Sequence, residues 1–284
     1  MKNFYHVTQY ILIFILFILF KIVGFKASSN FGFFIGKYLG PLFRPKSSII
    51  NNLKKAQISG DYKKIATNVL GNYGRIFAEY VHLKNFKNDR LNNHISIEGR
   101  EYLDRIKNKK QSVVFISGHF NNFELMAMHL EKSNIDLAAV YRPLNNMFLN
   151  PIMEKIREKY ICKKQIKKGI SGTKELLKEF KKGTSIALMI DQRVSEGIKS
   201  DFFGKEALTT TIPAQFVKKF NTDVVPIYVE RLIDNTFKLK IHDSIKFSND
   251  ETIDSITRKL NKILEKMIMS NPDQWIWTHS RWKI

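Results

Sequence analysis

Apolar residues recur with two different periods along residues 94–269, the period of buried strands and the period of helices. Short apolar runs rich in β-branched and aromatic residues predict strands over residues 94–98, 112–116, 137–141, 185–190, 224–230 and 237–241. Apolar residues at every third or fourth position predict helices over residues 101–108, 122–132, 149–159, 171–182, 211–220 and 250–269. Because helices alternate with apolar strands, the pattern predicts an α/β fold with a mostly parallel central sheet flanked by helices.

The N-terminal third of the chain has helical patterns of two kinds. Residues 10–25 form the most hydrophobic stretch, interrupted by Lys21. The segments at residues 31–39, 49–57 and 63–82 are amphipathic. We therefore expect three parts: an N-terminal membrane anchor over residues 1–29, a helical membrane-proximal region over residues 30–92, and an α/β core over residues 93–284.

The hydrophobic stretch at residues 10–25 is a little short for a perpendicular membrane span, which takes about 20 residues. A cleaved secretory signal is the main alternative, but the run consists of bulky Ile, Leu and Phe, and no Ala-x-Ala pattern follows it. We favour an uncleaved helix that either spans the membrane, with Lys21 reaching for the interface, or lies in the interface. The basic residues that follow it are Lys26, Lys37, Arg44 and Lys46, against Lys2 before it. This asymmetry predicts that the body lies on the cytoplasmic side.

The charge of the chain restricts its partners. The 284 residues carry 47 Lys and Arg against 26 Asp and Glu, a formal charge of +21, which indicates an anionic partner such as nucleic acid, an anionic membrane or an acidic protein. The single Cys162 excludes an internal disulfide and a cysteine-rich metal site. It is also consistent with a reducing compartment.

Aromatic and basic residues alternate just after the hydrophobic stretch. They are Phe33, Phe34, Lys37, Tyr38, Phe43, Arg44 and Lys46. Such interleaving can bind single-stranded nucleic acid by stacking. We favour a membrane-facing platform, and no nucleic-acid partner, because the segment adjoins an apolar anchor. A second basic segment, residues 155–182, is a candidate dock for anionic lipid or for a small acidic carrier protein, although a solvated helix face has the same composition.

The candidate chemistry is concentrated in residues 112–124. Ser117-Gly118 ends the buried strand, so His119 is expected at a strand-to-helix turn, with Glu124 on the first turn of the next helix. In that position Glu124 can fold back to fix the imidazole of His119, which leaves the other ring nitrogen free to accept a proton. The alternative is structural: Asn121-x-x-Glu124 also fits a capping box, and Asn121-Asn122 are good helix N-caps.

Other polar residues follow neighbouring strands of the predicted sheet. Arg142 follows the strand at residues 137–141, and Asp191-Gln192 follow the strand at residues 185–190. Ligands of such sheets bind at the carboxyl ends of the strands, so these residues are expected to converge with His119 at one edge. The sequence contains no P-loop, GxGxxG, GxSxG or HExxH motif.

Four blocks in a fixed order complete the pattern. They are Gly118-His119-Phe120-Asn121-Asn122-Phe123-Glu124; Tyr141-Arg142-Pro143-Leu144-Asn145-Asn146, followed by Arg157; Asp191-Gln192 with Phe202-Phe203-Gly204 and Thr210-Thr211-x-Pro213-Ala214; and Pro272-x-Gln274-Trp275-x-Trp277-x-His279-x-Arg281-Trp282. In this order the sequence resembles the late acyltransferases of lipid A biosynthesis, the lauroyl/myristoyl family within the glycerolipid acyltransferase superfamily. The likeness spans nearly the whole chain. The family usually has Gly where this chain has Asn121, a residue that tolerates positive φ.

The resemblance implies an acyl transfer from acyl carrier protein to a hydroxyl of a lipid A precursor, at the cytoplasmic face of the inner membrane. His119 is then the general base and Glu124 the residue that orients it, with no cofactor and no metal, because the thioester is already activated. Arg142 and Arg157 are expected to contact substrate or phosphate, with Asp191 and Gln192 in supporting positions at the substrate.

Some alternatives stay open at this point. Arg142 and Arg157 could instead pair with Asp191 to hold strand ends together. Trp275 and the two tryptophans after it are expected to be core or interface anchors, and His279 a satisfied polar residue. The same motifs also fit an acyltransferase that acts on another glycolipid or a glycerophospholipid, and the charge alone fits a non-enzymatic module that binds membrane or nucleic acid.

Overall fold

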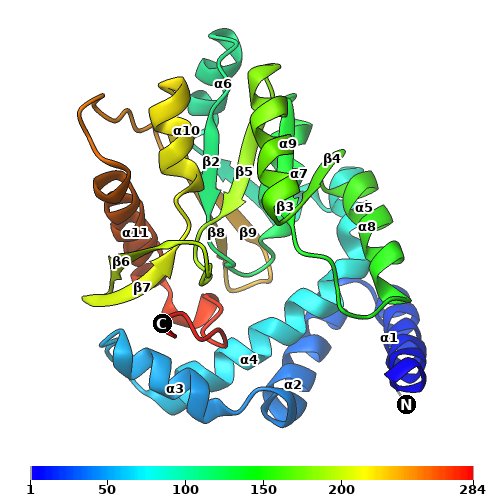
Figure 1. Cartoon of the computed structure of the whole chain (residues 1–284). Helices are drawn as coiled ribbons and strands as arrows, with labels where there is room; N and C mark the ends of the chain where they lie inside the picture. Colours follow the sequence, from blue (N-terminus) through cyan, green and yellow to red (C-terminus); the bar gives the residue numbers. More distant parts are fainter. Residues whose placement is uncertain (1, 284) are drawn as a thin grey trace.

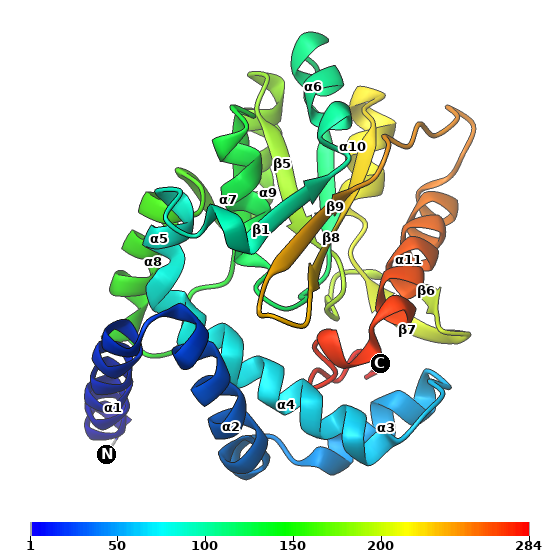
Figure 2. The same ribbon diagram turned by 180° about the vertical axis from the view of Figure 1, so that it is seen from behind.

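A seven-stranded sheet forms the centre of the molecule, with helices on both of its faces (Figures 1 and 2). The computed structural model describes residues 2–283; Met1 and Ile284, the outer limits of the expected anchor and core, and the side chains of Lys2 and Asn3 lie outside the described residues. The strands of this sheet, in spatial order, are β1 (Ile95–Glu98), β9 (Phe237–Ile241), β8 (Val224–Arg231), β2 (Val114–Ser117), β5 (Ser185–Met189), β3 (Leu137–Tyr141) and β4 (Lys164–Lys167). Neighbours are parallel except for the antiparallel pair β8–β9, which confirms the predicted, mostly parallel sheet.

Helices account for most of the remaining chain. The α-helices are α1 (Lys2–Val23), α2 (Phe25–Phe43), α3 (Lys46–Lys55), α4 (Tyr62–Glu79), α5 (Leu83–Lys87), α6 (Arg100–Asn108), α7 (Glu124–Lys132), α8 (Leu149–Tyr160), α9 (Ile170–Lys181), α10 (Ile212–Phe220) and α11 (Ile253–Ser270). Short 3-10 segments are η1 (Tyr80–His82), η2 (Asn92–His94) and η3 (Pro272–Gln274). The predicted helices and strands are all present, with ends shifted by a few residues.

Three strands were not predicted. Strand β4 is an edge strand of sequence Lys-Gln-Ile-Lys in which only Ile166 is buried, so it has no apolar run. Strands β6 (Ile198–Phe202) and β7 (Lys205–Thr209) form a separate antiparallel hairpin. Its two-residue turn, Phe203-Gly204, has positive φ at both positions, and a Phe there conceals the usual sequence signal of such turns.

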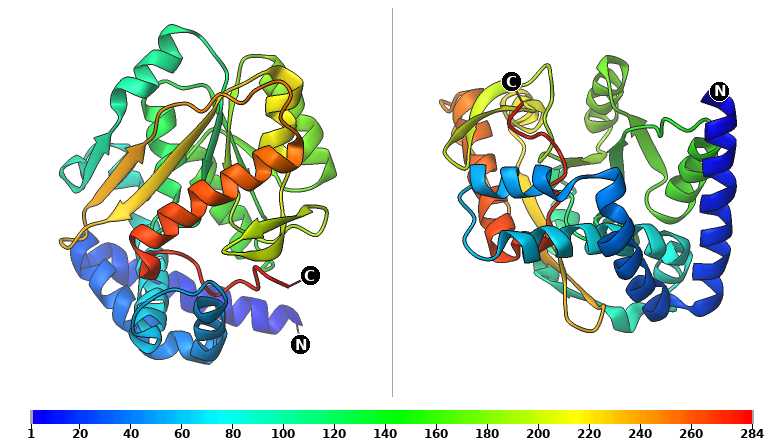
Figure 3. Two further views of the ribbon diagram at one scale, coloured as in Figure 1. Left: turned by 90° about the vertical axis from the view of Figure 1, so that its left-hand side faces the viewer. Right: turned by 90° about the horizontal axis from the view of Figure 1, so that it is seen from below.

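The N-terminal helices cover the edge of the sheet at which β2, β5 and β3 end. Figure 1 shows α4 passing across this edge, with α2 and α3 beyond it. Helix α1 lies beside the same layer, next to the start of α8 (Figure 3). The division of the chain into an anchor, a membrane-proximal region and a core stays a prediction.

Glycines allow α2 and α4 to pack backbone against backbone. A Cβ atom added to Gly74 would lie 1.9 Å from the carbonyl oxygen of Gly32, and one added to Gly36 would lie 2.1 Å from that of Leu70. Neither site can accept a side chain without moving a helix, because both contacts are to backbone. This close crossing fixes the height of α4 above the sheet edge.

A buried ion pair then ties α4 to the sheet. Glu79, at the end of α4, is fully buried, and its Oε1 lies 2.7 Å from Nη1 of Arg231 at the end of β8. Ser29 of α2 donates a hydrogen bond to Oε1, and Asn122 of the β2–α7 turn donates one to Oε2. One carboxylate therefore joins two N-terminal helices, the sheet and the turn that carries His119.

Candidate active site

The turn at residues 118–123 holds His119 at the carboxyl end of β2. Asn121 has φ of 45°, the left-handed region that Gly and Asn tolerate best. Its amide nitrogen donates to the carbonyl oxygen of Val229 and to Oε1 of Gln274, so it fastens the turn to β8 and to the C-terminal segment. The expected N-caps and the alternative capping box are both wrong, because the N-cap position of α7 is Phe123 and carries no side-chain cap.

Asp191 holds His119 through both the main chain and the side chain. Its Oδ1 accepts a 2.8 Å hydrogen bond from Nδ1 of His119, and its Oδ2 accepts one of 2.8 Å from the backbone N–H of His119. Oδ2 also accepts a hydrogen bond from the indole N–H of Trp275. The imidazole is thus fixed by a carboxylate that is itself anchored.

The charge state of Asp191 determines the tautomer of His119. Burial of Asp191, which by itself raises the pKa, is outweighed by the neighbouring imidazole and by hydrogen bonds from His119 and Trp275, so the pKa of Asp191 falls to about 2. An ionised carboxylate can only accept hydrogen bonds, so Nδ1 of His119 must carry its proton. Nε2 of the neutral ring is then unprotonated and can take up a proton.

The register of the sheet explains why Asp191 is the partner. Ser117 of β2 lies opposite Met189 of β5, so the residues two positions further on, His119 and Asp191, come level at the same edge. The predicted convergence of these strand ends is confirmed. The expected pairing of His119 with Glu124 is wrong, because Nδ1 of His119 binds Asp191 and Oε1 of Glu124 binds other side chains.

Glu124 belongs to a second polar cluster in the same cleft. Its Oε1 accepts hydrogen bonds from Nε of Arg157 and from the hydroxyl of Tyr80, and it lies 3.1 Å from Nη2 of Arg157. Burial of Arg157 acts to lower its pKa, but Glu124 and Tyr80 outweigh it, and the pKa of Arg157 is raised. Arg157 is therefore held as a fixed cation. The alternative in which Arg157 pairs with Asp191 does not hold.

Gln192 separates two imidazoles. Its amide nitrogen lies 3.1 Å from Nε2 of His279 and 3.4 Å from each ring nitrogen of His119. Burial and the neighbouring His119 lower the pKa of His279, which favours the neutral form of its ring. The expected satisfied polar role of His279 is confirmed by this contact, but no feature of the sequence indicated that it reaches the site.

Two cavities meet at His119. We call the first the apolar cavity; its volume is about 340 Å³, and its wall is built by α4, with Tyr80 just beyond it, and by the C-terminal segment. Helix α4 contributes Val69, Asn72, Tyr73, Ile76 and Phe77, and the C-terminal segment contributes Asp273, Gln274, Trp275, Ile276 and His279. We call the second the polar cleft; its volume is about 550 Å³ and it contains Glu124, Arg142, Arg157 and Lys168. The residues that line both are His119, Phe123, Gln192 and His279. A substrate bound at this junction can therefore place an apolar chain on one side and an anionic group on the other.

The polar cleft contains cations of two kinds. Arg157 is paired with Glu124, as described above. Arg44, Arg142 and Lys168 line the same cleft, and among the described residues the side chains of these three have no hydrogen-bonding or ion-pair partner. Arg44, which the sequence assigned to the membrane platform, comes from the end of α2. Unpaired cations at the opening of a cleft favour an anionic ligand.

The remaining candidates of the sequence are core residues. Trp275, Trp277 and Trp282 are all buried, as expected of core anchors. Trp275 also has the second role described above, as a donor to Asp191. Among the described residues no group of three or more His, Cys, Asp or Glu side chains could hold a metal ion.

Comparison with known proteins identifies the family. The whole chain, residues 1–284, matches the family described as bacterial lipid A biosynthesis acyltransferase. The chain belongs to this family. The resemblance carried by the four sequence blocks is thereby confirmed.

Curated relatives of this family are similar over part of their length. A lipid A biosynthesis palmitoleoyltransferase of Escherichia coli (strain K12) is 25% identical over 202 residues, which cover 68% of this chain and 63% of the relative. A lipid A biosynthesis acyltransferase of Haemophilus influenzae is 24% identical over 203 residues, 70% of this chain and 63% of that protein. The matched region is thus less than two thirds of the length of each of these two relatives.

Proposed function

We propose that this member of the lipid A acyltransferase family transfers a fatty acyl chain from acyl carrier protein to a hydroxyl of a lipid A precursor. One observation carries the proposal: an imidazole held by an ionised carboxylate stands where an apolar cavity meets a basic cleft. The family match and the names of the relatives support the same acceptor class.

The acyl chain occupies the apolar cavity. Its wall is aliphatic and aromatic, and the burial of each methylene contributes about 0.8 kcal/mol. The thioester carbonyl then lies at the junction beside His119 and Gln192. In this position the amide N–H of Gln192 can donate to the oxygen on which negative charge develops.

His119 is the general base. As the acceptor oxygen attacks the carbonyl carbon, Nε2 takes its proton, and the resulting imidazolium is stabilised by Asp191. Collapse of the tetrahedral intermediate breaks the carbon–sulfur bond, and the leaving thiolate of the carrier takes the proton back. The products are the ester and the free carrier thiol, and every atom and proton is accounted for without a covalent acyl-enzyme.

The anionic acceptor lies in the polar cleft. Arg142 and Lys168, unpaired at its opening, suit a phosphate, and Arg forks bind such groups in two-point fashion. Glu124 stays a candidate catalytic residue, but we assign it a positioning role, since it fixes Arg157 rather than His119. Its removal releases Arg157 and disturbs the wall of the cleft.

The carrier protein docks on the basic segment at residues 155–182. Lys164, Lys167 and Lys182 of this segment pair with acidic side chains, whereas Lys174 and Lys178 of α9 have no ion-pair partner among the described residues. Lys168 belongs to the segment and also lines the polar cleft. An acidic carrier bound here delivers its thioester close to the opening of that cleft.

Membrane association completes the proposal. Helix α1 contains a 20-residue segment, Phe4–Val23, that is long and apolar enough to cross a membrane. We assign the body to the cytoplasmic face of the inner membrane, because more basic residues follow α1 than precede it and such an asymmetry favours that side. The acceptor is itself a lipid, so a site at a membrane surface needs no extraction of substrate into water.

Two measurements test the proposal. The first is the acyl-chain number of lipid A in a strain that lacks the protein, and the second is the turnover rate of the purified protein in detergent or vesicles. Mass spectrometry is expected to show lipid A with one acyl chain fewer, restored by the wild-type chain and not by His119→Ala. Turnover of acyl carrier protein thioester by His119→Ala is expected to fall at least about a hundredfold. Wild-type turnover by a folded His119→Ala would refute the assigned base.

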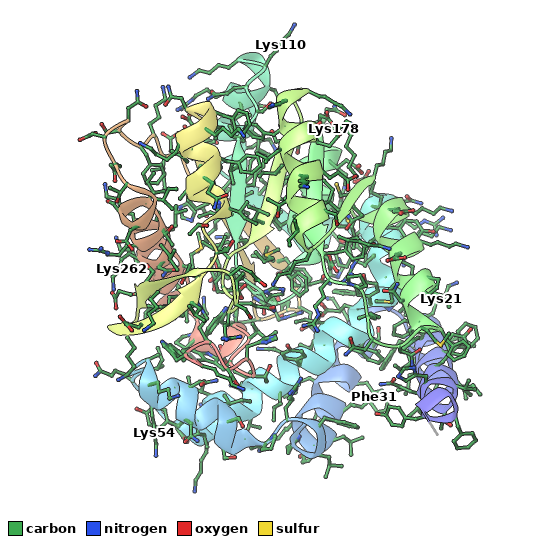
Figure 4. The ribbon with its side chains drawn as sticks, viewed as in Figure 1. Lys21, Phe31, Lys54, Lys110, Lys178 and Lys262 are labelled. Carbon is green, nitrogen blue, oxygen red and sulfur yellow. The ribbon has the colours of Figure 1, made fainter. Side chains whose placement is uncertain are left out.

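Two other functions are separated by the same experiment. Unchanged lipid A, together with His119-dependent acylation of another glycolipid or a glycerophospholipid, would show that the acceptor is a different lipid. The role proposed for His119 would then still hold. A non-enzymatic nucleic-acid binder would bind in a salt-dependent way that ignores His119. Lys54, Lys110 and Lys262 project at well-separated places on the surface (Figure 4), whereas Arg44, Arg142 and Lys168 line the polar cleft.

A further inference from the structure

Helix α1 has a covered stripe along its whole length. Its covered or partly covered residues recur at helical spacing and are His6, Gln9, Tyr10, Ile13, Leu16, Phe17 and Phe20. The residues between them are exposed and mostly large and apolar; examples are Phe4, Ile11, Ile15, Ile18 and Ile22. The helix thus binds the body with one face and offers the others to lipid.

The body contacts α1 near both of its ends. Near the C-terminal end, the rings of Phe17 and Phe20 lie 5.1 and 6.2 Å from the ring of Phe77 on α4. Near the N-terminal end, the amide nitrogen of Asn146 donates 2.9 Å hydrogen bonds to the carbonyl oxygen of His6 and to Oε1 of Gln9. These contacts are spread over most of the helix.

The spacing of these contacts is incompatible with a helix that crosses the bilayer. At 1.5 Å per residue, His6 and Phe20 are about 21 Å apart along the axis. If α1 stood upright with Phe20 at the boundary, Asn146 would lie deep in the hydrocarbon, followed by α8 with Lys155 and Arg157. Buried charges at such depth are strongly unfavourable.

The views of the fold agree with this geometry. Seen from below, α1 is visible along its whole length and runs in the plane of the lower face, beside α2 and α4 (Figure 3). Phe31 projects from α2 toward the side on which α1 lies (Figure 4), and its ring is 6.2 Å from that of Phe20. The two helices therefore form one continuous apolar surface.

We infer that α1 lies in the plane of the membrane, within the leaflet that faces the body, and that the N-terminus stays on the side of the body. The inference rests on the membrane association proposed above and not on the acyl transfer. The same leaflet then takes exposed apolar side chains of α2 at helical spacing, which are Phe31, Phe34, Tyr38 and Leu42. Lys21, in the last turn of α1, suits an anionic head group.

The orientation has a consequence for the substrate. Asn146, which holds the N-terminal half of α1, also accepts hydrogen bonds from the backbone N–H groups of Phe148 and Leu149 at the start of α8. The preceding residues, Arg142 and Leu144, line the polar cleft, as does Arg44 at the end of α2. An in-plane α1 thus sets the opening of the cleft at the leaflet surface, where a lipid acceptor can enter sideways.

Depth measurements along one face of α1 test the inference. Phe4→Cys, Ile11→Cys and Ile18→Cys are seven residues apart, so their side chains share a face, and all three wild-type side chains are exposed. Each variant is labelled with a fluorescent maleimide and reconstituted into vesicles of phosphatidylethanolamine and phosphatidylglycerol. Nitroxide lipids with spin labels at known depths then report the position of each probe. Native Cys162 is buried and does not compete for the label, and Lys110→Cys, at the far end of the molecule, is the control (Figure 4).

An in-plane helix places the three probes at equal depth, near the boundary between head groups and acyl chains. A spanning helix places the probe at position 11 about 10 Å deeper than those at positions 4 and 18, which would overturn the inference. Quenching at none of the three would overturn it as well, together with the proposed membrane association. Acyl transfer measured in the same vesicles shows separately whether the proposed function stands.

Discussion

Replacing Asp191 by Asn tests the assignment of the catalytic carboxylate, because it keeps the shape of the side chain and removes its charge. Oδ2 accepts two N–H groups, from the His119 backbone and from Trp275, whereas Oδ1 accepts one. The amide oxygen of the new side chain is therefore expected to take the place of Oδ2. The amide NH₂ then faces Nδ1 of His119, which must become an acceptor. The ring proton moves to Nε2, where it blocks proton uptake from the acceptor hydroxyl.

The expected loss of rate is large. Fixing the wrong tautomer of a catalytic imidazole costs about 10⁴ in kcat in a comparable Ser-His-Asp site. That factor corresponds to about 5.5 kcal/mol of transition-state stabilisation. We expect the same order for Asp191→Asn, with KM little changed, because Asp191 does not line either cavity.

The same substitution lowers stability in a pH-dependent way. A pKa depressed from 3.8 to about 2 corresponds to about 2 kcal/mol of folding free energy. Since the folded-state pKa is the lower one, this contribution is fully present above the unfolded value and is lost as the pH falls from about 4 through 2. Asp191→Asn is expected to melt at a lower temperature at pH 7 and to lack this part of the acid dependence.

The assay compares Asp191→Asn with Glu124→Gln in turnover of acyl carrier protein thioester and in thermal melts. Glu124→Gln removes a charge-assisted bond to Arg157 that is worth about 1.5–3 kcal/mol. The turnover rate of this variant is therefore expected to fall about 10–150-fold. The opposite result would refute the reasoning: a turnover rate about 10⁴-fold lower in folded Glu124→Gln, with the rate of folded Asp191→Asn within about tenfold of wild type.

Three further predictions concern the cleft, the cavity and the buried ion pair. Arg142→Ala is expected to raise KM for the anionic acceptor about 10–100-fold, less at high salt, with kcat nearly unchanged; Lys110→Ala is the charge-matched control. Ile76→Phe narrows the apolar cavity, so kcat/KM for the longest donor is expected to fall about fourfold for each methylene expelled, while shorter donors are spared; Ile170→Phe, on an 81% exposed side chain, is the control. Glu79→Ala leaves Arg231 buried without its partner and is expected to cost about 3–5 kcal/mol in denaturant unfolding.

Each of these expectations can fail in a recognisable way. A salt-independent loss of kcat in Arg142→Ala would place Arg142 in the chemistry instead of acceptor binding. An unchanged donor preference in Ile76→Phe would show that the acyl chain does not bind in the apolar cavity. A cost for Glu79→Ala no larger than that of Arg105→Ala, which breaks a half-exposed pair worth at most about 1 kcal/mol, would show that the buried pair does not secure α4.

The sequence predicted those parts of the structure that depend on local pattern. Apolar runs and helical periods located the strands of the sheet, and the rule for carboxyl ends of parallel strands brought His119, Arg142 and Asp191 to one edge. The sequence pattern nevertheless predicted the wrong carboxylate as the partner of His119, because Glu124 is only five residues away along the chain. The strand order, which makes β5 the neighbour of β2, cannot be derived from the order of strands along the chain.

The missed residues share a cause. Tyr80, His279 and Arg44 come from helices and a C-terminal segment that reach the site only through packing between the two ends of the chain. No spacing rule links residue 44 to residue 279. Signals were present, since Tyr80 ends an amphipathic helix and His279 belongs to the fourth sequence block, but they indicate burial or family membership and not position.

The arrangement of the site separates chemistry from chain selection. His119 and Asp191 follow the ends of β2 and β5, whereas the wall of the apolar cavity is shared by the C-terminal segment and α4. Helix α4 is fastened to the sheet by Glu79 and to α2 by glycine contacts. Substitutions on the inner face of α4 can therefore change the accepted chain without moving His119. Helix α4 also contacts α1. The side chain of Phe77 lines the cavity and packs against Phe17 of α1. Phe77 is thus the one side chain between Phe17 of α1 and the apolar cavity. If the acyl chain occupies that cavity and α1 contacts lipid, as proposed above, we expect the donor preference to differ between detergent and vesicle assays.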